Sequence, residues 1–130
     1  MHKPLKLTLI LLLLILISCE DDVEFKYDID DLIDTRWGVP HIEEVAPNVT
    51  DYDQSAPTIF YDDGTMIIGD SRYDFWRIRN SHSLHIEKMG EIWFIRELTP
   101  NKLHVEKSTY PAGNFILRCI YYSMGESNNE

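Results

Sequence analysis

Short runs of alternating apolar and polar residues, separated by turn-forming residues, constrain the fold of this chain most strongly. Within residues 75–79 and 84–87 apolar side chains recur at every second position, as expected for strands with one buried face. The turn at residues 62–64 ends in glycine, which accepts the positive φ that tight hairpin turns require. No apolar repeat of helical spacing extends beyond a turn or two. The pattern therefore predicts an all-β domain.

The same reasoning gives eight strands, joined mostly by short turns. A meander of sequence neighbours favours an eight-stranded antiparallel up-and-down barrel over a Greek-key sandwich. A barrel of this size has room for either a filled core or one small ligand. A short helical turn is expected at residues 31–34. The predicted strands are residues 37–45, 58–61, 65–68, 75–79, 84–87, 92–98, 103–109 and 115–124.

The first nineteen residues predict where the protein is located. Lys3 and Lys6 precede an almost continuous apolar run over residues 7–17, and Ser18 and Cys19 follow it. The run is far shorter than the ~20 residues that a membrane-spanning helix needs, so it predicts a secretion signal. Its ending resembles the bacterial lipobox, in which the cysteine becomes the lipidated first residue of the mature protein.

The lipobox predicts an anchored protein of the bacterial cell envelope. We expect residues 1–18 to be removed and Cys19 to carry two acyl chains, which together give stable membrane binding. Seven of the twelve residues at 20–31 are acidic, which predicts an extended tether over residues 19–31. Acidic residues at this place also act as an export tag in some Gram-negative bacteria. The expected location is the outer membrane, and the sequence leaves open whether the domain faces the periplasm or the exterior.

Composition limits the partners of the mature chain. Removing residues 1–18 removes two lysines and changes the net charge from −10 to −12, which disfavours nucleic acid as a partner. The rest of the chain has room for one domain at residues 32–124 and a polar tail at 125–130. With Cys19 lipidated, Cys119 has no disulfide partner, and its apolar neighbours predict a buried, inert thiol. We expect a monomer without a cofactor.

Several short motifs are similar to those of the bacterial lipocalin-like lipoproteins. They are Leu32-Ile33-Asp34-Thr35-Arg36-Trp37, Phe60-Tyr61-Asp62-Asp63-Gly64-Thr65, the strand with Trp76, and Ile95-Arg96-Glu97-Leu98-Thr99 followed by Leu103. The resemblance covers about residues 32–122 and implies a lipocalin-type barrel. It also implies that Arg118, late in the chain, packs on Trp37 of the first strand. Thr35 stands where lipocalins usually carry glycine, which is a departure from the classical ligand carriers.

The sequence contains no catalytic signature. It has no nucleophile elbow, phosphate loop or nucleotide fingerprint, so we expect neither an enzyme nor catalytic residues. His82 and His85 are three positions apart and would face opposite sides of a strand, so no metal site is predicted from them. Asp62 and Asp63 precede a glycine, where turn chemistry explains paired acids better than acid–base chemistry does.

Two functions remain open for such a barrel. The first is a binding module that holds a small apolar ligand inside. The alternative is a structural or interaction lipoprotein with a filled barrel, which recognises a protein partner through its loops. Cavity volume distinguishes the two. Alternation places eleven side chains inside, where they would line the ligand site: Phe60, Met66, Ile68, Trp76, Ile78, Leu84, Ile86, Trp93, Ile95, Leu103 and Val105.

The variant Cys19→Ser tests the anchor. We expect it to move the protein to the soluble fraction, because the acyl chains are lost while the folded domain is untouched. Membrane fractionation followed by immunoblotting measures this, and Ser18→Ala is the control because it keeps a small residue before the cysteine. A Cys19→Ser protein that still sediments with membranes would show that the lipobox interpretation is wrong.

Overall fold

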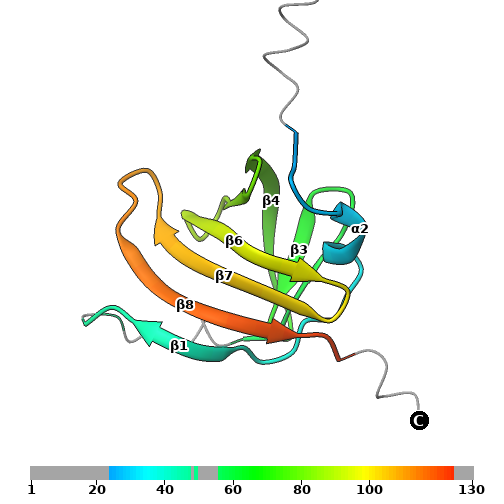
Figure 1. The fold of residues 1–130 in the computed structure, drawn as a ribbon, viewed down its shortest axis with the longest axis horizontal. Coiled ribbons are helices and arrows are strands. Elements are labelled where there is room, and N and C mark those ends of the chain that lie inside the picture. Colours follow the sequence, from blue (N-terminus) through cyan, green and yellow to red (C-terminus); the bar gives the residue numbers. More distant parts are fainter. Residues whose placement is uncertain (1–23, 48, 50–55, 125–130) are drawn as a thin grey trace, which may run out of the picture.

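Eight antiparallel strands form one curled, half-barrel sheet in this computed structural model, which describes residues 24–47, 49 and 56–124 (Figure 1). Their spatial order is β1-β8-β7-β6-β5-β4-β3-β2, so β1 and β2 form the two edges and the first strand lies beside the last. The predicted all-β class and the eight antiparallel strands are confirmed. The strands are β1 (His41–Val45), β2 (Thr58–Phe60), β3 (Thr65–Ile68), β4 (Arg72–Asn80), β5 (Ser83–Ile86), β6 (Glu91–Thr99), β7 (Lys102–Thr109) and β8 (Phe115–Tyr122).

The segment before the sheet packs against it. Helix α2 (Ile29–Leu32) starts two residues before the predicted helical turn, because the carboxylate of Asp28 caps it by accepting a hydrogen bond from the backbone N–H of Asp30. Between residues 24 and 31, three apolar side chains pack on the core: Phe25, Tyr27 and Ile29. This part of the predicted acidic tether therefore belongs to the domain. The predicted signal peptide, Cys19 and the tail at 125–130 lie outside the described residues.

The core lies inside the curl of the sheet and is rich in aromatic rings. Phe60 on β2 meets the indoles of Trp76 and Trp93 edge-to-face, with ring centroids 5.6 Å and 5.8 Å apart. Cys119 on β8 is fully buried as a free thiol, as predicted, and burial raises its pKa. The domain is therefore held by packing across the curl, in agreement with the absence of a disulfide partner for Cys119.

Trp37 links strand β2 to the end of β8. Its backbone N–H donates to the carbonyl of Thr58 on β2, and its carbonyl accepts from the N–H of Thr58, both at 2.9 Å. On its other side it forms an isolated bridge with Ser123, just after β8. The side chain is fully buried, as predicted, and its indole Nε1 donates to the carbonyl of Leu32 at 3.2 Å. One residue thus contacts α2, β2 and the end of β8.

The predicted stacking of Arg118 on Trp37 is wrong. Trp37 lies opposite Ser123, five positions beyond Arg118, which is roughly 17 Å along an extended strand. Arg118 points outward and pairs with acids of β1: its Nε lies 3.1 Å from Glu43 and its Nη1 lies 3.0 Å from Glu44. The reason is that β1 runs beside β8, which brings the two glutamates closer to Arg118 than the tryptophan.

A buried carboxylate fixes the turn that follows β5. Asp74 on β4 is fully buried and belongs to the same row of the strand as the inward-facing Trp76, while Tyr73 and Phe75 on either side of it are exposed. Its two carboxylate oxygens accept hydrogen bonds from the backbone N–H groups of Phe75, Lys88 and Met89 at 2.7, 2.6 and 3.0 Å. The backbone N–H groups thus supply the hydrogen bonds that water would give to an exposed carboxylate. This contact holds the β5–β6 turn against β4.

The variant Trp37→Ala is expected to lower the free energy of unfolding by about 3–5 kcal/mol, because it leaves a large cavity and breaks the bond to Leu32. A loss of that size is a large share of the stability of a small domain. Trp37→Phe keeps most of the packing and should lose much less. Urea denaturation followed by circular dichroism measures both variants. An unchanged midpoint for Trp37→Ala would contradict the role assigned to this side chain.

Candidate functional site

The eleven side chains predicted to face inward do so. Ten of them are buried members of one hydrophobic cluster, and Ile78 is partly buried against it. Trp93 is the inward residue of β6 and Phe94 is half-buried on the other face, so the register of this strand is as predicted. These side chains contact one another across the curl of the sheet. Their role as a ligand site stays a prediction.

A lysine that is not among the predicted site residues lies among the buried aromatic rings. Lys107 on β7 is 1% exposed, and its Nζ lies 4.0 Å from the ring centroid of Trp93. The same ammonium donates a hydrogen bond to the hydroxyl of Tyr121 at 2.7 Å. Glu91 is also buried and accepts a bond from the indole Nε1 of Trp93 at 2.9 Å. Alternation from Leu103 and Val105 would have placed Lys107 inside.

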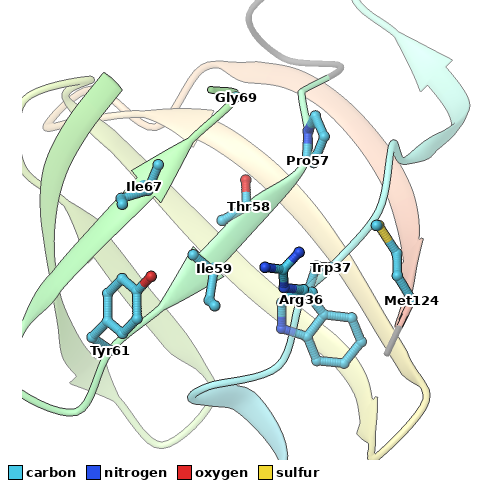
Figure 2. A pocket seen from close by; sticks show the side chains of 9 residues that line it. All are labelled: Arg36, Trp37, Pro57, Thr58, Ile59, Tyr61, Ile67, Gly69 and Met124. Atoms are coloured by element: carbon cyan, nitrogen blue, oxygen red, sulfur yellow. The ribbon is translucent and has the colours of Figure 1, made fainter. Parts of the chain in front are cut away.

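Among the hollows compared in the described part of the chain, the one lined by the most apolar side chains lies on the outside of the sheet. It is a groove of about 230 Å³ between β2, β3 and the segment that contains Trp37 (Figure 2). Two other hollows, of about 340 and 310 Å³, are lined by fewer apolar side chains. The groove is lined by Arg36, Trp37, Pro57, Thr58, Ile59, Tyr61, Ile67, Gly69 and Met124.

Local geometry explains why Arg36 borders this groove. Neighbouring residues of an extended chain point to opposite sides, so the burial of Trp37 sends the side chain of Arg36 outward. The same alternation on β2 buries Thr58 and turns Ile59 outward. Because Trp37 is bonded to Thr58, the two outward side chains are neighbours, and Figure 2 shows the guanidinium of Arg36 beside Ile59. The groove therefore combines apolar walls with one cation.

The groove continues into an apolar surface on β2, β3 and β4, which we call the outer apolar face. Ile59, Ile67 and Tyr73 lie opposite one another in a single cross-strand row. Tyr73 and Phe75 remain 58% and 45% exposed. Tyr61 borders the same area from the end of β2. Aromatic and aliphatic side chains gathered on one exposed face are typical of a recognition surface.

The two histidines considered for a metal site have different partners. His82 lies in the β4–β5 turn, with its Nδ1 3.1 Å from the hydroxyl of Ser81. His85 is buried on the outer side of β5 under Tyr110, at a ring-centroid distance of 4.2 Å. Arg77 donates from Nη2 to Nδ1 of His85 at 2.8 Å, which requires that nitrogen to be unprotonated.

The paired aspartates form a turn, as predicted. Asp63 accepts hydrogen bonds from the backbone N–H of Thr65 at 3.0 Å and from its hydroxyl at 2.6 Å, and these bonds lower the pKa of the Asp63 carboxyl. Gly64 has a φ of 91°, which explains the glycine. Among residues 24–47, 49 and 56–124, no three side chains of metal-ligand type gather, and no helix is long and apolar enough to span a bilayer.

Comparison with known proteins gives no relative for this chain. No protein-family model, no curated protein and no solved structure matches it. The function must therefore be inferred from the residues and geometry of the site itself.

Burial and the positive charge of Arg77 lower the pKa of His85 in the folded protein below its unfolded-state value of about 6.5. The unfolded state then takes up the proton more readily, and stability should fall as the pH decreases below about 6.5. We expect His85→Gln to show a smaller loss of stability between about pH 7.5 and about pH 5 than the wild type, measured by urea denaturation. Equal losses in both proteins would contradict the assignment of this titration to His85.

Proposed function

We propose that this chain is a lipid-anchored binding module of the bacterial cell envelope, with a filled interior and its recognition site on the outer apolar face. The observation that carries the proposal is the position of the apolar groove. It lies outside the sheet, between Arg36, Ile59 and Ile67, while the side chains predicted to line an internal cavity are packed together. The proposal keeps the filled-barrel hypothesis but moves recognition from the loops to the sheet.

Buried Lys107 and the side chains that contact it support a filled interior. An ammonium group deep in a protein is costly unless it is paired and hydrogen-bonded. Lys107 meets this requirement through Tyr121 and the face of Trp93, and these three side chains come from the neighbouring strands β7, β8 and β6. An enclosed apolar ligand would have to displace this set. Binding at the outer face leaves the set intact.

A closed, lipocalin-type barrel is part of the same proposal. The single-residue bridges of Trp37 to Thr58 and to Ser123 support it, because they join β2 to the end of β8 across the gap between the two edges of the sheet. Closure protects edge strands from pairing with other chains, which an exported domain without a disulfide needs. Lipid attachment at Cys19, placement in the outer membrane and a monomeric state belong to this proposal as well.

Two matched variants distinguish a filled interior from an open one. Ile86 on β5 is fully buried, and Ile67 on β3 lies on the outer apolar face. With a filled interior, Ile86→Glu should unfold the domain at room temperature, because a carboxylate is buried without a partner. Ile67→Glu should stay folded. Circular dichroism and urea denaturation measure both; a folded, stable Ile86→Glu would indicate an open cavity and contradict the proposal.

Native mass spectrometry of protein purified from its own host tests where recognition occurs. We expect a ligand adduct on the wild type that is lost in Ile67→Glu, since a charge on the outer apolar face opposes apolar contact. The matched control is Arg96→Gln, which changes an exposed charge paired with Glu106 elsewhere on the sheet. An adduct retained by folded Ile67→Glu would place recognition away from this face and contradict the proposal.

A further inference from the structure

Arg36 is an arginine without a carboxylate partner in the described part of an acidic chain. The protein has 22 acidic residues against 12 basic ones. Three other arginines, Arg77, Arg96 and Arg118, each pair with a glutamate at 3.0–3.4 Å. No ion pair or side-chain hydrogen bond joins Arg36 to any described residue, and only its backbone carbonyl is engaged, by Met124. A guanidinium beside an apolar groove, with no acidic partner among the described residues, points to an acceptor on the ligand.

The rest of the groove supplies apolar contact. Ile59 and Ile67 stand side by side on adjacent strands, and Pro57 lies at one end of this wall. Met124 borders the opposite side, next to Arg36 and Trp37 (Figure 2). A methionine side chain is unbranched and adapts its shape to what it contacts. The ligand therefore needs an apolar body that lies on the isoleucines and one anionic group at the edge.

We propose that the groove binds a small carboxylic acid with an apolar body, whose carboxylate pairs with Arg36; this rests on the proposed function of the outer apolar face. A guanidinium presents two parallel N–H donors that match the two oxygens of a carboxylate. The apolar body lies against Ile59 and Ile67, where its burial removes water from both surfaces. The site recognises the ionised carboxylate of an unesterified acid.

Size limits the ligand further. The groove holds about 230 Å³, which is below the ~300–1,000 Å³ typical of sites for drug-sized molecules. An acyl chain of medium length or one aromatic ring fits that volume better than a sterol or a long-chain lipid. Beyond the groove, Tyr73 continues the cross-strand row of Ile59 and Ile67, so a longer chain would extend over an exposed surface and gain less per carbon.

Octanoate, octanol and octylamine test the proposal, because they share one apolar chain and differ only in the head group. NMR chemical-shift titration of the intact domain at fixed ionic strength measures each dissociation constant and the residues affected. We expect octanoate to bind at least about tenfold more tightly than octanol, and octylamine to bind most weakly. Octanoate should shift the resonances of Ile59 and Ile67. Equal affinities, tighter binding of octylamine, or no binding of octanoate would overturn the proposal.

Arg36→Gln should weaken octanoate binding to the level of octanol and leave octanol binding unchanged. Arg36 is exposed, so the variant is expected to fold as the wild type does. Arg96→Gln removes one positive charge elsewhere and should not change either affinity. An unchanged affinity of Arg36→Gln for octanoate contradicts the role of the guanidinium. If octanoate fails while the host-derived adduct is still lost in Ile67→Glu, only the ligand class is wrong and the proposed function stands.

Discussion

The hydrogen bonds of Trp37 link β2 to the end of β8, and the groove exists because of them. A strand edge offers unpaired backbone groups, and here one extended residue pairs with Thr58 and bridges to Ser123. Its indole fills the space beneath α2 and donates to Leu32. With Trp37 held in this way, Arg36 must point outward beside β2. The same contact that completes the core therefore places the cation at the apolar groove.

Inside the curl, charge and aromatic rings replace what would otherwise be a simple apolar core. The ammonium of Lys107 lies over Trp93 and bonds to Tyr121, and burial raises the pKa of the Tyr121 hydroxyl well above its ordinary value. The Tyr121 phenol therefore stays neutral over the physiological range and accepts the hydrogen bond from Lys107 at 2.7 Å. Such a cluster needs every member in place, since loss of one leaves another buried without its partner. It favours a fixed interior over one that opens for ligands.

The strands and their inward side chains were accessible from the sequence because both depend on local rules. Alternation places Leu103, Val105 and Lys107 on one face, and turn residues mark where each strand ends. The contact of Arg118 with Glu43 was not accessible, because it depends on β1 lying beside β8, a pairing of residues 75 positions apart. The groove is non-local in the same way. It requires Arg36, Ile59 and Met124 to meet, and no spacing along the chain signals this.

The acidic composition of the protein also affects how the apolar groove would choose a ligand. At distances beyond about 10 Å the net charge of −10 repels anions, although salt screens much of this effect. At contact distance the guanidinium of Arg36 dominates, because a bidentate pair with a carboxylate is short and charge-assisted. The long-range field thus repels every anion, while the groove binds favourably only those anions whose apolar part covers Ile59 and Ile67. Selection for amphipathic acids over inorganic anions follows from the combination of both effects.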